Sequence, residues 1–278
     1  MSDRRHPDAP EAQASKQPRL AVLIPVFKDQ TGLEKALTSL AADGEEFSVY
    51  VVDDGSDPPA RIPPDLPYAV HVIRQEPNQG ITAALNSGLS VICKAGYQYV
   101  ARLDAGDLSL PGRLAAQLDF LDRHPEHAAV GTATRHVDVD GRVLYDFHPP
   151  AEHGDVVRGL RYQAALVHPS IMLRLEAVQA CGMYEHRFPG GEDYDLFFRL
   201  ARNYKLANLQ GVYVVKEINS SSITAQRRKM LLGRLGRLKL LAWHFDHRSV
   251  HSYLGIVANV LAMLVPRRLI FRVRRWQG

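Results

Sequence analysis

Cysteine is scarce in this sequence of 278 residues, which contains only Cys93 and Cys181. The two lie far apart and neither belongs to a C-x-x-C pair, which argues against a disulfide scaffold and against a zinc site. We expect two reduced, mostly buried thiols in a cytoplasmic protein. The first 18 residues contain no apolar segment, so we predict a disordered tail and no signal peptide.

Acidic residues are nearly absent from the end of the chain. Residues 227–278 contain twelve lysines and arginines but one acid, Asp246, whereas residues 1–226 contain 22 basic and 29 acidic residues. An acidic body with a basic tail is not the pattern of a nucleic-acid-binding domain, and we expect no nucleic acid partner. The pattern fits a globular catalytic body whose tail meets an anionic surface.

The first half of the chain alternates between apolar strands and amphipathic helices. Residues 19–27 and 47–52 are continuous apolar runs rich in branched side chains, which is typical of buried parallel strands. A capping box at residues 31–34 predicts the start of a helix. We predict further elements as strands over 70–74 and 97–103, a helix over 79–95 and a helix opened by Pro111. This alternation predicts an α/β fold with a doubly wound, mostly parallel sheet flanked by helices.

The pattern loosens beyond residue 128. We predict strands over 128–134, 143–147, 166–173 and 212–215, and helices over 192–203 and 225–247. The chain then divides into a disordered tail (1–18), a catalytic domain (19–225) and a basic, amphipathic helical extension (226–278). The catalytic domain has a nucleotide-binding half (19–125) and an acceptor-side half (126–225).

Two acidic clusters follow predicted strands. Asp53 and Asp54 end one strand, and Asp104 and Asp107 lie in a turn after another. In doubly wound sheets ligands bind at the carboxyl ends of the strands, where both clusters are expected. Asp104 and Asp107 have the oxygen ligands that a hard divalent cation prefers, and Asp53 can accept from a base or a ribose. Ordinary acidic turns remain the alternative for both clusters.

A third acidic site opens a predicted helix. Glycines at 190 and 191 precede Glu192 and Asp193, in the first turn, where the helix dipole favours negative charge. A carboxylate fixed there can take the proton of an attacking hydroxyl. Ordinary helix capping by acids remains the alternative.

Taken in order, these segments resemble the family 2 glycosyltransferases with the GT-A fold, over about residues 19–225. The matching segments are Ile24-Pro25-Val26-Phe27, V-D-D-G-S over 52–56, the N-x-G segment over 78–88, R-L-D-A-x-D over 102–107, P-x-R-L-x-x-Q over 111–117, H-P-S over 168–170 and E-D-Y-D-L over 192–196. The resemblance implies a GT-A sheet and an inverting transfer of a sugar from a nucleotide-diphosphate donor, expected to be UDP-linked, to an acceptor hydroxyl. No Q-x-x-R-W is present, which is typical of a non-processive enzyme.

The resemblance also implies roles for single residues. Asp193 would be the general base, with Glu192 beside it, Asp53 would contact the base, and Asp104 the ribose or the metal-bound diphosphate. A Mn²⁺ or Mg²⁺ ion would be held by Asp104 and Asp107. The donor pocket would be lined by Pro25, Phe27, Asp53, Asp54, Asn78, Gly80, Arg102 and Asp104.

Two positions depart from the family pattern and put the metal in doubt. Gly106 stands where relatives carry the metal-binding acid, so Asp107 would have to replace it. Asn219 stands near where many relatives carry a histidine, and an amide is a poorer ligand. Two rival functions stay open: a sugar nucleotidyltransferase, although no Gly-rich basic loop follows the first strand, and a non-catalytic relative that binds nucleotide-sugars.

The end of the chain combines apolar and basic residues. Residues 253–265 are nearly apolar but fewer than the roughly 20 that a membrane span needs, and five arginines follow among bulky apolar residues. We expect residues 249–278 to lie on an anionic membrane, on the inner face of the cell membrane. The acceptor would then be a glycan or a lipid-linked glycan, in surface polysaccharide, O-antigen or glycolipid synthesis. A core or dimer helix is the alternative, and an oligomer stays open.

Overall fold

The computed structural model describes residues 19–162, 165–188, 190–218 and 236–264. The predicted tail over 1–18, Asn219 and the arginines after residue 265 lie outside these ranges. Nothing in the structure tests the predicted domain boundaries, which stay predictions.

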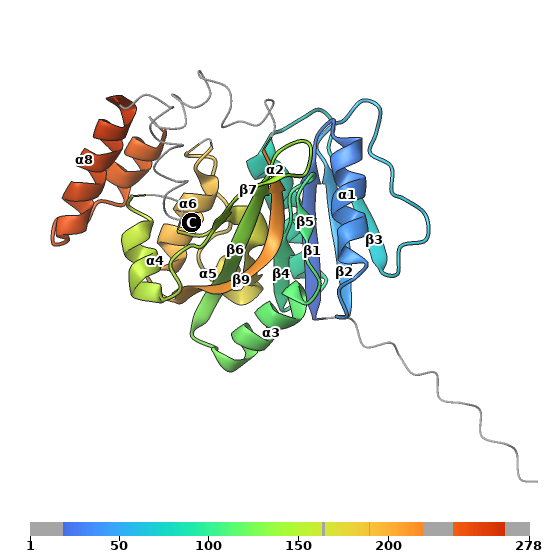
Figure 1. The fold of residues 1–278 in the computed structure, drawn as a ribbon, viewed down its shortest axis with the longest axis horizontal. Helices are drawn as coiled ribbons and strands as arrows, with labels where there is room; N and C mark the ends of the chain where they lie inside the picture. Colours follow the sequence, from blue (N-terminus) through green and yellow to red (C-terminus); the bar gives the residue numbers. More distant parts are fainter. Residues whose placement is uncertain (1–18, 163–164, 189, 219–235, 265–278) are drawn as a thin grey trace, which may run out of the picture.

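Four parallel strands form the first half of the sheet (Figure 1). They are β1 (Leu20–Val26), β2 (Phe47–Asp53), β3 (Ala69–Arg74) and β4 (Tyr99–Arg102), arranged in the order β3-β2-β1-β4. Every residue of β1, β2 and β4 is buried, whereas β3 is a largely exposed edge strand. The apolar runs of the sequence predict this because central parallel strands are covered on both faces.

The second half of the sheet mixes directions. The strands β8 (Met172–Arg174), β6 (His127–Val137), β9 (Lys205–Glu217) and β5 (Leu108–Ser109) continue the sheet in that order, and β7 (Val143–Phe147) pairs with β6. β8 is antiparallel to β4 and β6, β9 is parallel to β6, and β5 is antiparallel to β9. The predicted α/β class is confirmed, and β1–β4 are the part of the sheet in which every pairing is parallel.

Helices cover both faces of the sheet (Figure 1). α1 (Gln30–Leu40) and α3 (Arg113–Arg123) pack on one face, and α2 (Ile81–Lys94), α5 (Leu175–Ala180) and α6 (Glu192–Leu200) pack on the other. Alternate residues of β1 supply the two cores, since successive strand side chains point to opposite faces. Leu20, Val22 and Ile24 face the α1 side, and Ala21 and Leu23 face the α2 side.

The start of α1 corrects one prediction. The N-cap is Asp29, whose carboxylate accepts a hydrogen bond from the Gly32 N–H at 2.9 Å, so Thr31 of the predicted capping box lies inside the helix. Aspartate is as good a cap as threonine and lies two residues earlier, next to the end of β1.

Two predicted strands also differ from the structure. Residues 166–173 do not form one strand, because a 3₁₀ turn over His168–Ser170 (η1), with a proline that lacks an N–H, precedes the short β8. The strand predicted over 212–215 is the last part of the much longer β9, whose Gln210 and Gly211 are exposed and interrupt the apolar pattern. Both cysteines are free but half-buried rather than buried.

The C-terminal helices lie at the end of the molecule opposite β3 (Figure 1). Residues 236–243 are helical, and α8 (Val250–Leu264) follows. α8 is anchored beside α4 (His153–Gly159) by Arg161, whose Nε donates to Ser252 Oγ at 3.1 Å and whose carbonyl accepts from Asn259 Nδ2 at 3.0 Å. No helix among the described residues is both long enough and apolar enough to cross a membrane.

Candidate active site

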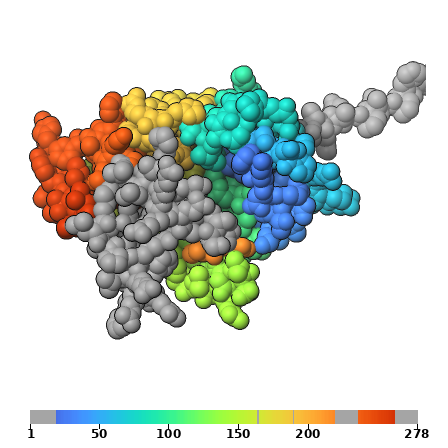
Figure 2. Space-filling model, turned by 90° about the horizontal axis from the view of Figure 1, so that it is seen from above, coloured from blue at the N-terminus to red at the C-terminus, as the bar shows by residue number. Residues whose placement is uncertain are grey.

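The predicted acidic clusters meet at the carboxyl edge of the parallel strands, onto which Figure 2 looks. Asp53 ends β2, Asp104 follows β4, and both strands flank β1. The Asp54 N–H donates to the Val26 carbonyl at 2.9 Å, and the Leu103 N–H donates to the Leu23 carbonyl at 3.2 Å. The two clusters therefore lie on either side of one strand end, as the sequence predicts.

Asp53 is buried and its carboxylate is fully engaged by the protein. It accepts hydrogen bonds from the N–H groups of Ser56 at 2.9 Å and Ala60 at 3.0 Å, and from Arg74 Nη1 at 2.6 Å. Burial alone would raise the pKa of Asp53, but these hydrogen bonds outweigh it and lower the pKa. Asp53 thus fixes the loop after β2, while a direct contact with a base stays a prediction.

Asp54 fixes a second loop in the same way. Its carboxylate accepts from Asn78 Nδ2 at 2.8 Å and from the N–H groups of Gln79 at 2.7 Å and Gly80 at 2.9 Å. Gly80 has φ of 89°, a left-handed conformation that glycine adopts without strain, and it caps α2. Asn78 and Gly80 are therefore held against Asp54, and their predicted contact with the donor stays a prediction.

A cavity of about 300 Å³ opens between the segment after β1 and the loop after β2. It is lined by Val26, Lys28, Asp29, Gln30 and residues 56–61. Pro25 is buried inside β1, whereas Phe27 is exposed and carries the Lys28 ammonium over its ring at 5.4 Å from the centroid. Neither Pro25 nor Phe27 lines this cavity, although both belong to the segment that forms its edge.

Asp104 and Asp107 lie beside two cations. Arg102 forms an ion pair with Asp104, and Lys216 of β9 has its Nζ 2.6 Å from Asp107 Oδ2 and 3.9 Å from Asp104 Oδ2. Burial would raise the pKa of Asp104, but Arg102 and Lys216 lower it. Burial raises the pKa of Asp107 to about 6, although Lys216 opposes that change. Asp104 and Asp107 thus form a mixed cluster with two cationic side chains, Arg102 and Lys216.

The residues of this turn do not fit a divalent cation held by the protein. An ammonium group already lies on both carboxylates, and Gly106 supplies no third oxygen. Among the described residues, the group of three side chains able to share one ion is His124, Glu126 and His127, at the opposite edge of the sheet. We therefore derive no step through a metal ion at Asp104 and Asp107.

Asp193 lies in the first turn of α6 and is partly buried. Burial raises its pKa to about 7, and the charge of the neighbouring Glu192 raises it further in the same direction. Glu192 is itself buried, and its Oε2 has no hydrogen-bond partner among the described residues. A carboxyl group with a pKa near 7 exchanges protons readily at neutral pH, which is the property that a general base needs.

Arg102 connects the acid of α6 to the turn after β4. Its guanidinium interacts electrostatically with Asp193, with Asp104 and with Tyr184. Tyr184 is buried and donates or accepts at 2.7 Å with His168 Nε2, on η1. Burial lowers the pKa of His168 well below its ordinary value, so this ring is neutral beside the charged cluster. Asp193 and Asp104 therefore both lie within electrostatic reach of the same guanidinium.

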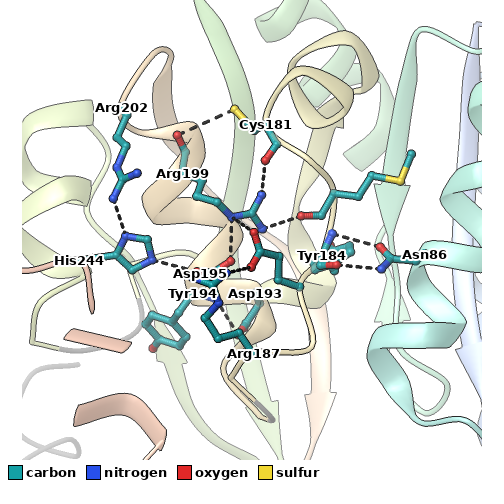
Figure 3. Close-up of polar contacts among 12 residues, drawn as sticks. Asn86, Cys181, Tyr184, Arg187, Asp193, Tyr194, Asp195, Arg199, Arg202 and His244 are labelled. Carbon is teal, nitrogen blue, oxygen red and sulfur yellow. Dashed lines mark hydrogen bonds and ion pairs between the residues drawn. The ribbon is translucent and has the colours of Figure 1, made fainter. Parts of the chain in front are cut away.

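Asp195 fastens α6 to the C-terminal helices (Figure 3). Its carboxylate is buried, accepts from Arg199 Nε at 2.7 Å and lies 2.9 Å from His244 Nε2. The other ring nitrogen of His244 lies 3.0 Å from Arg202 Nη2. α6 is thus tied to the C-terminal helices through Asp195, while the Asp193 carboxylate accepts from the Tyr194 N–H at 2.8 Å.

Sequence reasoning missed three members of the site. His168 belongs to the H-P-S segment that the sequence singles out without assigning it a role, and Tyr184 lies in no motif. Lys216 reaches the acids because β5 and β9 pair Leu108 with Val215 and Ser109 with Val214, which continues to Asp107 opposite Lys216. Only the pairing register reveals this neighbour, since the two residues are 109 positions apart.

Comparison with known proteins finds a matching sequence family and similar proteins. The model of a family described as glycosyl transferase family 2 matches residues 21–181, more than half of the chain. The amylovoran biosynthesis glycosyltransferase AmsE of Erwinia amylovora is 28% identical over 157 residues, which cover 56% of this chain and 57% of that protein. The matched region thus spans little more than half of that relative.

Solved structures share the fold. S. aureus TarS (residues 1–349), in complex with UDP-GlcNAc, superposes with a TM-score of 0.62 at 17% identity and covers 87% of this chain and 71% of its own. The mannosyltransferase PcManGT from Pyrobaculum calidifontis, in complex with GDP-Man and Mn²⁺, gives 0.58 at 19% identity, over 88% and 69%. These likenesses confirm the predicted GT-A fold class.

Proposed function

This chain belongs to glycosyl transferase family 2 and is a glycosyltransferase, and from that premise we propose that it transfers a sugar, with inversion, from a UDP-linked donor to an acceptor hydroxyl. The observation that carries the proposal is the Asp193 carboxyl group. Burial raises its pKa to about 7, and the Arg102 guanidinium at the carboxyl edge of the sheet acts on it electrostatically. A proton acceptor and an anion site therefore meet where a nucleotide-sugar would react.

The proposed reaction needs one displacement. The acceptor oxygen bonds to the anomeric carbon while the bond from that carbon to the diphosphate oxygen breaks, and its electron pair leaves with the diphosphate. Asp193 takes the proton of the acceptor hydroxyl, and Glu192 keeps the pKa of Asp193 high. Attack opposite to the leaving group inverts the anomeric configuration, and no covalent intermediate with the protein forms.

The base of the donor is assigned to the cavity beside β1 and β2. Its volume of about 300 Å³ lies at the lower end of ligand pockets and is large enough for a base. Asp53 supports the binding of this base indirectly, because it accepts hydrogen bonds from the Ser56 and Ala60 N–H groups and so holds the loop over 56–61. TarS, which shares the fold, was solved with UDP-GlcNAc, and this supports a UDP-linked donor here.

We assign the acceptor to surface polysaccharide, O-antigen or glycolipid synthesis, on a glycan or a lipid-linked glycan. The name of AmsE, a relative in amylovoran biosynthesis, supports this class. We propose no divalent cation at Asp104 and Asp107, because the Lys216 ammonium lies beside both carboxylates. PcManGT, which shares the fold, was solved with Mn²⁺, so the test below includes metal.

We further propose that α8 rests on the inner face of the cell membrane. One side of α8 is anchored to Arg161, and the other exposes an apolar stripe of Val250, Tyr253, Leu254, Val257, Val260 and Leu261. Val257 and Leu261 are 53% and 55% exposed. An amphipathic helix next to a basic segment suits an anionic interface. Replacing both residues with Asp should abolish cosedimentation with anionic vesicles, and unchanged cosedimentation would favour a dimer helix.

A donor panel tests the enzymatic proposal. Purified full-length protein is incubated with UDP-, GDP- and dTDP-sugars, and released nucleoside diphosphate is measured with EDTA, with Mn²⁺ and with Mg²⁺. Release from a UDP-sugar, abolished by Asp193→Asn, is the expected result. Nucleotide binding without release from any donor would favour the non-catalytic alternative. Release of pyrophosphate from a nucleoside triphosphate and a sugar phosphate would favour the nucleotidyltransferase alternative.

A further inference from the structure

Lys216 occupies the place that the sequence assigns to a metal ion. Its Nζ lies 2.6 Å from Asp107 Oδ2 and 3.9 Å from Asp104 Oδ2, so one ammonium group bridges the two carboxylates. The position is fixed by the backbone, because the β5–β9 pairing brings Lys216 opposite Asp107. Lys216 is thus a built part of the site and not a surface side chain that happens to reach it.

The Arg102 guanidinium beside Lys216 has hydrogen-bond donors that the two carboxylates do not use. Arg102 is 4% exposed, and its Nε and Nη1 have no hydrogen-bond partner among the described residues. Buried guanidinium donors that lack partners are costly unless a ligand uses them. Asp104 forms an ion pair with this guanidinium and a longer one with the Lys216 ammonium. Two donor atoms of Arg102 are therefore left without an acceptor beside the Lys216 ammonium.

Oxygen anions are the ligands that such a pair of cations binds. A diphosphate offers several negatively charged oxygens, which accept from guanidinium and ammonium groups in short charge-assisted hydrogen bonds. When the sugar leaves, one more negative charge appears on the diphosphate, and fixed cations in a partly buried site stabilise that charge most. A divalent cation does the same work in other sites, through the same electrostatic attraction.

We propose that Lys216, together with Arg102, neutralises the diphosphate leaving group in place of a divalent cation, so that this enzyme transfers sugar without a metal ion. The inference rests on the proposed function. In the step itself, the electron pair of the broken carbon–oxygen bond goes to the diphosphate oxygen, and Lys216 Nζ donates to that diphosphate. Asp107 and Asp104 hold the ammonium in place before the donor arrives.

Metal dependence and one substitution test this proposal together. Nucleoside diphosphate release by the wild-type protein should change less than twofold between excess EDTA and millimolar Mn²⁺. Lys216→Met should lower kcat by about 100-fold or more, as expected for a lost leaving-group stabiliser, and Lys216→Arg should restore part of it. Lys205→Met is the matched control, since Lys205 lies on the same strand, is exposed and pairs only with Glu126 in the described contacts. Full activity of Lys216→Met, or a wild-type enzyme that EDTA inactivates and Mn²⁺ restores, would overturn the proposal.

A binding measurement separates this inference from the proposed function. UDP and GDP are titrated by calorimetry into wild-type, Lys216→Met and Lys205→Met proteins in EDTA, after circular dichroism has confirmed that each is folded. Lys216→Met should lower the affinity of the nucleotide that binds by at least tenfold, and Lys205→Met should not. If no donor is turned over but this loss is seen, the proposed function fails, and only the binding of the diphosphate by Lys216 stands. If donors are turned over and Lys216→Met binds and reacts like the wild type, only the role of Lys216 fails.

Discussion

The pKa of Asp193 predicts a sharp dependence of turnover on pH. If Asp193 must be ionised to accept the proton, kcat rises with pH and levels off above its pKa, which burial raises to about 7. Below that value kcat falls about tenfold for each pH unit, so at pH 5 it should be about 1% of the plateau. The fall of kcat at low pH reflects the protonation of Asp193. Asp193→Asn should therefore lower kcat by at least about 100-fold and leave a residual rate without this pH dependence.

The same raised pKa predicts an opposite effect on stability. In the unfolded chain Asp193 ionises near its ordinary pKa of about 3.9, whereas in the folded protein it holds its proton until about pH 7. Between these values the folded state binds the extra proton, so stability is lost as the pH rises through this window. Asp193→Asn removes that loss. We expect about 1–2 kcal/mol of added stability at pH 8, allowing for screening of a partly exposed group, and no difference near pH 4.

Two measurements check these effects on the same samples. Hydrolysis of the donor, in which water replaces the acceptor hydroxyl, gives kcat from pH 5 to 9, and urea unfolding gives the free energy of unfolding at pH 4, 5 and 8. Asp119→Asn, an exposed residue of α3, is the matched control and should change neither profile. A flat kcat profile, or an Asp193→Asn variant that is active or less stable at pH 8, would refute the reasoning about this carboxyl group.

Three further substitutions test how the site is supported. Gly88→Val should destabilise the protein by about 1–3 kcal/mol in urea unfolding, because a Cβ there would meet Leu23 Cδ1 at 2.3 Å, and only a stability equal to wild type contradicts this. Asp53→Ala should weaken UDP binding at least tenfold in calorimetry by freeing the loop over 56–61, and an unchanged affinity would make the loop irrelevant. His244→Ala should cost about 1–3 kcal/mol by leaving the buried Asp195 with one fewer partner, with Asp195 and His244 showing strong coupling in a double-mutant cycle.

The buried strands and the acidic edge of the sheet could be predicted because both depend on local sequence. The continuous apolar runs of β1 and β2 can be buried only in a covered sheet, and an acid at a parallel strand's end must lie at its carboxyl edge. Asp53 and Asp104 accordingly lie where the sequence places them. The predicted start of α1 was wrong because both Asp29 and Thr31 can cap a helix. Only the position at which β1 ends determines which of the two is the N-cap.

The mixed half of the sheet and the partners of the acids could not be read from the sequence. β9 pairs with β6 over long distances along the chain, and a pairing register leaves no local signal. The same holds for Lys216, which is apart from Asp107 in sequence but adjacent across two strands. The predicted metal site therefore rested on the acids alone. Local patterns reveal which groups lie at an edge, and only the tertiary pairing reveals what neutralises them.

The hydrogen bond between Asp195 and His244 joins α6 to the end of the molecule that carries α8. α6 holds Asp193 in its first turn, and the chain reaches α8 six residues beyond His244. A bilayer touched by α8 would thus lie at a set height from the proton acceptor. Acceptors tethered to that bilayer would be selected by the length of the segment between the lipid and the reacting hydroxyl. A segment that is too short would not reach Asp193, and one that is too long would place the hydroxyl beyond it. The fold would then set which acceptor length can react, in addition to holding the proton acceptor in place.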